Sequence, residues 1–276
     1  DSMTVTQVKK DHNILILVKT YPSPSAKYIE TCCTAGIDDQ GKMVRIYPIP
    51  FRYLNETKRY KKWQWIKGTT HTNSDDQRPE SRKIDYTAME AGIEIPSTAW
   101  EERIRWLNKC PFFDSVEAIE QARQKSNVSL GVVKVSSIVG LEFQKEDDDW
   151  TPEQKAKLLQ EQQDDLFHET EVDSSKVQLL EKIPYGFYYK FTGADRNKVE
   201  RIRITDWEIY QLYRNTVGIR QGNWQQKMID KYVTEFSKRD VFLILGNMHR
   251  FQNEWLCIGV VAAPRGAQGP ATGELF

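Results

Sequence analysis

The stretch Asn13-Ile14-Leu15-Ile16-Leu17-Val18-Lys19-Thr20 is a short run of apolar and β-branched residues that ends at Tyr21-Pro22-Ser23-Pro24. Such a run, stopped by prolines, predicts a buried strand. Residues 25–35 have helical spacing between a serine cap and a glycine stop, which predicts a short helix. Residues 43–50 are rich in β formers, and their two prolines indicate a sheet edge or a strand end. The chain is therefore expected to open with a strand, a helix and a second strand.

Further along, the sequence predicts strands that occur singly and in hairpins, interspersed with helices. Residues 62–67 alternate apolar and polar side chains, which indicates a third strand, and residues 68–82 indicate a polar loop. The sequence shows no regular alternation of strand and helix and no fixed-period repeat. We therefore predict the α+β class, with peripheral helices around a small mixed or antiparallel sheet that can curl into a barrel.

The most acidic part of the chain is residues 142–173, where three lysines stand against twelve carboxylates. Thr151-Pro152-Glu153 is typical of a helix start, and the helix is expected to run to about Phe167. This pattern predicts an acidic helical connector. We accordingly divide the chain into an N-terminal α+β lobe (1–144), the connector (145–176) and a C-terminal α+β lobe (177–276), which can form one compact domain with the first.

Composition excludes several classes of protein. The chain has 39 basic and 39 acidic residues, so a protein-wide positive field of the kind a generic polyanion binder uses is absent. The sequence contains neither an apolar run approaching the ~20 residues of a membrane span nor a secretory signal pattern. The four cysteines lack a C-x-x-C spacing. We expect a soluble cytoplasmic protein with reduced thiols and no membrane partner.

Residues 52–67 are the most basic part of the chain, with six cations against one glutamate and several aromatic residues between them. Cations neutralise phosphates, and exposed rings stack unpaired bases, so this stretch predicts nucleic-acid binding. The alternative is a solvated strand whose tryptophans are core anchors. The contacts that we predict are Arg45, Arg52, Lys58, Arg59, Lys61, Lys62, Trp63, Trp65, Lys67, Arg78, Arg82 and Arg250.

A second hypothesis is a metal-dependent nuclease. Asp76 and Glu80 could hold Mg²⁺ while Lys83 orients or activates water, although such residues also form local ion pairs in polar loops. Only this hypothesis involves a cofactor. No Cys/His framework for zinc and no glycine-rich phosphate loop is present, so no other metal site is predicted.

A third hypothesis is an interaction subunit that binds a protein partner through the acidic helix 152–167. The basic stretch favours the first hypothesis, the acids of the 75–83 loop permit the second, and overall neutrality favours the third. We predict a non-enzymatic nucleic-acid-binding or sensing module.

Lys19-Thr20-Tyr21-Pro22 and Arg45-Ile46-Tyr47-Pro48, then Asp206-Trp207-Glu208, then the Trp-x-x-Ile-Gly-Val element at 255–260 form a recognisable set. Together they resemble a family of uncharacterised bacterial proteins, over nearly the whole chain. Relatives carry cysteines and a Gly-His pair just ahead of the Asp-Trp-Glu element, and because residues 192–198 have neither, the resemblance implies no metal site there. It implies a shared bacterial architecture and intracellular biology, in defence or on mobile elements, without an activity to transfer.

Overall fold

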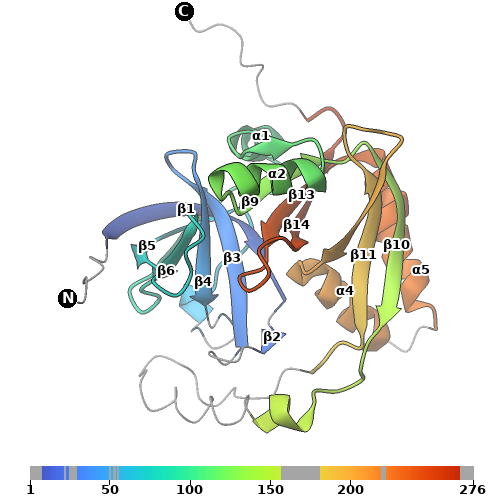
Figure 1. Ribbon diagram of the computed structural model, residues 1–276, viewed down its shortest axis with the longest axis horizontal. Coiled ribbons are helices and arrows are strands. Elements are labelled where there is room, and N and C mark those ends of the chain that lie inside the picture. Colours follow the sequence, from blue (N-terminus) through green and yellow to red (C-terminus); the bar gives the residue numbers. More distant parts are fainter. Residues whose placement is uncertain are drawn as a thin grey trace, which may run out of the picture.

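The structure is a computed structural model of the 276-residue chain. It describes residues 8–21, 23–24, 30–49, 51, 54, 56–156, 181–218 and 222–267. These residues form two β-sheets with helices packed around them, as Figure 1 shows. The predicted α+β class is confirmed, and so is the barrel.

The N-terminal sheet closes on itself. Its strands are β1 (Lys9–Lys19), β3 (Glu30–Asp38), β4 (Met43–Ile49), β5 (Gln64–Thr72) and β6 (Ser81–Ile84). They pair in the order β1-β3-β4-β6-β5, and β5 returns to pair with β1. Only the β4–β6 pair of this barrel is parallel. Two shorter strands, β2 (Ser23–Pro24) and β7 (Glu90–Glu94), add to β3 and β5.

The first strand shows why its sequence is apolar at every position. Ile14 and Ile16 point into the barrel, where they pack with Ile46 and Ile66. Leu15 and the other alternate residues point outward, yet they are also buried, because a second layer covers that side. A strand covered on both faces has no solvated side that would require polar residues.

The second layer is a mixed sheet in the order β10-β11-β12-β14-β13-β9-β8. Its strands are β8 (Phe112–Phe113), β9 (Leu130–Lys134), β10 (Ser137–Lys145), β11 (Tyr185–Thr192), β12 (Val199–Ile204), β13 (Arg239–Asn247) and β14 (Trp255–Pro264). One face of β9, β13 and β14 packs on the outer side of the barrel, together with helix α1 (Trp100–Leu107).

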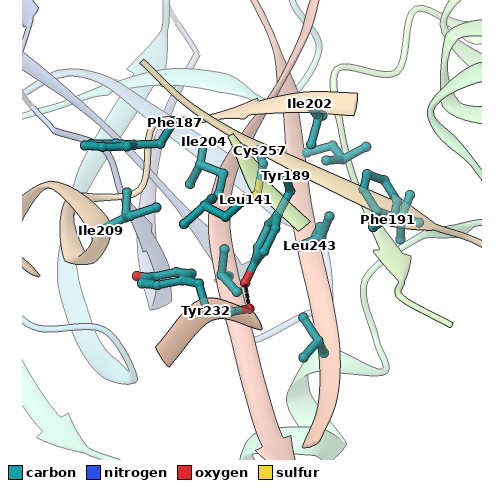
Figure 2. Close-up of a cluster of buried hydrophobic side chains, with 14 of the residues drawn as sticks. Leu141, Phe187, Tyr189, Phe191, Ile202, Ile204, Ile209, Tyr232, Leu243 and Cys257 are labelled. Carbon is teal, nitrogen blue, oxygen red and sulfur yellow. Dashed lines mark hydrogen bonds between the residues drawn. The ribbon is translucent and has the colours of Figure 1, made fainter. Parts of the chain in front are cut away.

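The other face of this sheet packs against α2 (Val116–Ser126), α4 (Trp207–Gly218), α5 (Trp224–Ile229) and the irregular helical turns that follow α5. Figure 2 shows this core, in which the Tyr189 hydroxyl donates a hydrogen bond to the Tyr232 carbonyl at 2.6 Å. Phe187, Tyr189 and Phe191 all point into it. Their neighbours at alternate positions of β11 must therefore face the opposite side.

Two sequence-based predictions are wrong. Residues 30–35 belong to strand β3 and not to a helix, because pairing with both β1 and β4 overrides a weak helical spacing; residues 25–29 lie outside the described part. The predicted loop 68–82 is wrong at both ends, since β5 runs to Thr72 and β6 begins at Ser81, which leaves residues 73–80 as the loop.

Domain limits and the acidic helix are only partly described. The predicted lobe boundary at residue 144 falls at the end of β10, whose pairing partner β11 lies beyond it. How many independently folding units the chain forms stays a prediction. Residues 152–156 are helical, and the rest of the predicted helix 152–167 lies outside the described residues. None of the helices in the described ranges has the length and apolar character needed to cross a bilayer.

Candidate nucleic-acid interface

The second sheet covers the outer face of β1, β3 and β4. In five-stranded barrels of the oligonucleotide- and oligosaccharide-binding type, the face of the second and third strands binds the ligand. Here those strands are β3 and β4, and their outward residues Ala35, Ile37 and Met43 are buried against β9, β13 and β14. The customary ligand face is thus part of the protein interior.

Arg45 lies in this seam and is 1% exposed. Its Nη1 donates to the hydroxyl of Ser129 at 2.7 Å, and its Nη2 donates to the Ser129 carbonyl at 2.8 Å. Glu80 accepts from both the backbone N–H and the hydroxyl of Ser129. Burial, together with the nearby Arg78 cation, lowers the pKa of Arg45. Arg45 therefore joins β4 to the start of β9 and has no surface from which to reach a phosphate.

Arg78 is likewise buried and joins the barrel to the second sheet. It donates to the Asp76 carboxylate from Nε at 2.9 Å and from Nη2 at 2.6 Å, and from Nη1 to the Asn247 carbonyl at 2.7 Å. Burial alone would raise the pKa of Asp76, but the hydrogen bonds and charge of Arg78 lower it to about 2. The pair is a structural clamp.

The three residues of the nuclease hypothesis each contact another partner. Asp76 is held by Arg78, Glu80 by Ser129, and the Lys83 ammonium lies 3.2 Å from Asp75. Across the described residues, no group of three or more His, Cys, Asp or Glu side chains could hold a metal ion.

Lys62 makes the most buried ion pair of the basic stretch. Its Nζ lies 2.6 Å from Asp206, which is fully buried, and 3.3 Å from Glu208. Burial lowers the pKa of Lys62, but the two carboxylates more than offset it, and the pKa is raised. Asp206 also accepts from the backbone N–H of Val260 and from that of Glu208, so it caps the start of α4. Lys62 therefore anchors the barrel to the second sheet.

The two tryptophans of the stretch are packed. Trp63 is 6% exposed and lies under the guanidinium of Arg103. It holds a left-handed backbone (φ 64°), fixed by hydrogen bonds to Ile16 and Ile95. Trp65 packs edge-on against Trp106 of α1 with ring centroids 4.9 Å apart. The predicted base stacking needs an exposed ring, and the Trp63 ring is buried.

The remaining predicted cations are dispersed. Lys58 and Arg59 donate to the carbonyls of Thr87 and Leu54, and Lys61 pairs with Glu94 at 3.3 Å. Arg82 donates to Thr70 and to the Val8 carbonyl. Lys67 is exposed opposite Glu90 on β7, Arg250 is exposed in the β13–β14 loop, and Arg52 lies outside the described residues.

A different set of residues meets on the face of β10, β11 and β12 that is turned away from the core in Figure 2. We call it the β10–β12 face and define it by Glu142, Glu146, Lys182, Tyr188, Lys190, Arg201 and Arg203. Cross-strand register places Glu142 opposite Tyr188, Tyr188 opposite Arg203, and Lys190 opposite Arg201. Four cations here stand against two carboxylates.

The centre of the face is an arginine stacked on a tyrosine. The Arg201 guanidinium lies 3.8 Å from the centroid of the Tyr188 ring, and the Arg203 guanidinium lies 5.7 Å from it. Arg203 also donates to the Tyr188 hydroxyl at 3.3 Å. An aromatic ring and two guanidinium groups thus lie together on one surface.

The two carboxylates hold the cations in place. Glu142 accepts from Arg201 Nε at 2.7 Å and lies 3.3 Å from Lys190 Nζ. Its hydrogen bond from Arg201 lowers the pKa of Glu142. Glu146 accepts from Arg203 Nη1 at 2.5 Å. Gly186 leaves the room for this pair, because a Cβ there would lie 2.8 Å from the Glu146 carboxylate and 3.1 Å from Arg203.

Sequence reasoning missed this face, although a signal was present. Tyr188 and Lys190, like Arg201 and Arg203, are two residues apart in the sequence, as residues on one face of a strand are. The missing information was the register between β10, β11 and β12, which decides that these residues are neighbours.

The chain matches two adjoining family profiles. Residues 10–109 match a domain of unknown function (DUF8758), and residues 112–276 match a second domain of unknown function (DUF8757). The first match covers the barrel, β7 and α1, and the second covers every strand of the second sheet. No curated protein matches the chain. The expected membership of an uncharacterised family is thus confirmed.

Proposed function

Because the chain belongs to the DUF8757 family of unknown function, we propose its role from its surface: it binds or senses single-stranded nucleic acid on the β10–β12 face. The observation that carries this proposal is the Arg201 guanidinium stacked 3.8 Å above Tyr188 on an exposed sheet surface. Sheet faces that bear aromatic rings and cations are a recurring platform for unpaired bases.

The charges of the face suit the binding of a polyanion with modest affinity. Arg201 and Lys190 are about two-fifths exposed, so their nitrogen atoms can reach a phosphate without repacking of the core. The exposed side of the Arg201 guanidinium can stack a base while its N–H groups contact the backbone. Because the whole chain is neutral, we expect contacts to few phosphates.

A single strand fits better than a duplex. Stacking on Tyr188 or on Arg201 needs a base whose faces are open, and bases in a duplex are already stacked. The elements of this face are the strands β10, β11 and β12, whereas reading a duplex in its major groove commonly uses a projecting recognition helix.

We place this activity in the cytoplasm. The described cysteines Cys33, Cys110 and Cys257 are free thiols, which suits a reducing compartment. Burial raises the pKa of Cys110 to about 12, so this thiol stays protonated and unreactive.

The test is fluorescence anisotropy with labelled single-stranded DNA, single-stranded RNA and duplex DNA, each titrated across salt with and without Mg²⁺. Wild type should bind single strands more tightly than duplex. Lys190→Ala and Arg201→Ala should each weaken binding and reduce the slope of log K against log salt by about 0.7. The matched control is Lys61→Ala, an exposed ion-paired lysine of the barrel.

Three results would count against the proposal. Absence of binding at low salt would reject it outright. Unchanged affinity in both variants, with a wild type that binds, would reject this face as the site. Shortening of the probe in Mg²⁺ would replace binding alone with an enzymatic role.

A further inference from the structure

The β10–β12 face already contains two anions in contact with its cations. Each oxygen of the Glu142 carboxylate meets a different cation, with Oε2 at 2.7 Å from Arg201 Nε and Oε1 at 3.3 Å from Lys190 Nζ. A phosphate offers the same feature, two acceptor oxygens on one atom, to the same donors. Glu142 therefore occupies the position that a backbone phosphate would need.

Glu146 repeats this arrangement at the neighbouring position. It accepts from Arg203 at 2.5 Å and lies 3.9 Å from Lys182. Burial would lower the pKa of Arg203, but the hydrogen bond with Glu146 raises it instead. Two carboxylates thus each bridge two cations, along the strand edge that precedes the acid-rich residues 147–149.

We propose that Glu142 and Glu146 are internal phosphate mimics, which hold the cations of the face in binding geometry in the free protein and are displaced by the backbone of a bound strand. This inference rests on the proposed function and adds its regulation, because binding becomes an exchange of one anion for another. No covalent bond is made or broken.

An exchange has a specific energetic signature. A solvated cation gains the full free energy of its interaction with a phosphate. A cation that must first leave a carboxylate gains only the difference between its phosphate and carboxylate interactions. Removing the carboxylate charge should therefore strengthen binding. A purely positioning carboxylate predicts the reverse, because its loss would release Arg201 from Tyr188 and weaken binding.

Glu142→Gln tests the exchange directly, because the amide keeps the shape and loses the charge. We expect Kd for a labelled single-stranded oligonucleotide to fall by about three- to fivefold, which is the range of one exposed ion pair. Because the same cations meet the same phosphates, the salt slope should change little. Glu146→Gln should act in the same direction.

The matched control is Glu117→Gln. Glu117 pairs with Lys198 at 2.5 Å on α2 and is more exposed than Glu142, and its replacement by glutamine makes the same change in net charge. Tightening in Glu142→Gln alone supports the exchange, whereas equal tightening in both variants reduces it to net charge and overturns it. Thermal melting confirms that each variant is folded, and Glu142→Asp, which keeps the charge with a shorter reach, provides a second test with an expected intermediate affinity.

The two proposals fail in different ways. If wild type binds and Glu142→Gln binds equally or more weakly, the phosphate-mimic proposal is overturned and the binding face stands. If neither wild type nor either glutamine variant binds any probe at low salt, both proposals fall. If wild type does not bind but Glu142→Gln does, the carboxylate blocks the face without being displaced by a strand, and both proposals are overturned.

Discussion

The basic stretch 58–67 and the β10–β12 face contain similar residues and put them to different use. In the basic stretch, the cations lie close together in sequence, and Lys58, Arg59, Lys61 and Lys62 each contact a different carbonyl or carboxylate. On the β10–β12 face, the cations come from segments far apart in sequence and meet around one tyrosine. Charge density along a sequence therefore does not measure charge density on a surface.

The difference follows from the position of each segment in the fold. Residues 58–63 lead into β5 and residues 64–67 begin it, and cations here pair with Glu94 of β7 and with Asp206 next to the second sheet. The strands β10 to β12 extend past the barrel, and one of their faces stays at the surface. Four predictions test this contrast.

The largest effect is expected at Lys62, the cation of the basic stretch that lies deepest in the junction. Lys62→Ala leaves the fully buried Asp206 without its cation, so we expect a loss of about 3–5 kcal/mol in the free energy of unfolding. Urea unfolding followed by tryptophan fluorescence measures it. Lys61→Ala, one residue away and exposed, should lose less than about 1 kcal/mol. Equal losses would contradict a structural role specific to Lys62.

The second prediction concerns the pH dependence of the clamp between Asp76 and Arg78. The pKa of Asp76 is lowered from 3.8 to about 2, so the folded state favours the carboxylate. This contribution of about 2 kcal/mol is fully present above pH ~4 and is lost as the pH falls toward 2. Asp76→Asn should lose it at neutral pH and flatten the urea stability profile between pH 4 and 2. A variant with the wild-type profile would show that the clamp does not stabilise the fold.

Much of the fold could be predicted from local sequence. The apolar run 13–20, the hairpin strands of the C-terminal half and the Ser115 cap of α2 all depend on residues close together in the chain. The helix expected at 25–35 failed over residues 30–35, because two neighbouring strands decided its conformation. Local spacing cannot carry that information.

The candidate site was less predictable, for a related reason. A buried arginine and an exposed one have the same sequence signal, and Arg45 lies in a strand whose outward face would be solvated in an isolated barrel. Its burial by Ser129 and Gly246 depends on the second sheet, which is encoded more than 80 residues away. Conversely, Glu142, Tyr188 and Arg201 become a site only through strand register.

The third prediction tests the stacking platform. Tyr188→Leu keeps an apolar side chain and removes the aromatic ring, so we expect Kd for a single-stranded probe to rise about tenfold, in the lower half of the usual range because Arg201 covers one side of the ring. Anisotropy titration measures this change. The matched variant is Trp65→Leu in the basic stretch, whose ring packs on Trp106; it should lower stability and leave the affinity of the folded protein unchanged. A larger loss of affinity at Trp65 would move the site to the barrel.

The smallest effect on nucleic-acid affinity is expected in the basic stretch, which gave the strongest sequence signal for binding. Lys61→Ala and Lys67→Ala remove two exposed cations of the barrel, and because neither lies on the β10–β12 face, the affinity and the salt slope for a single strand should both stay within error of wild type. Replacing Lys190 and Arg201 removes the same number of charges and should reduce the slope by about 1.4. The pairs are matched in charge, so only their location can separate them. A slope reduced equally by both would mean that the neutral chain attracts nucleic acid through its overall charge distribution, and the contrast between the two regions would then have no functional meaning.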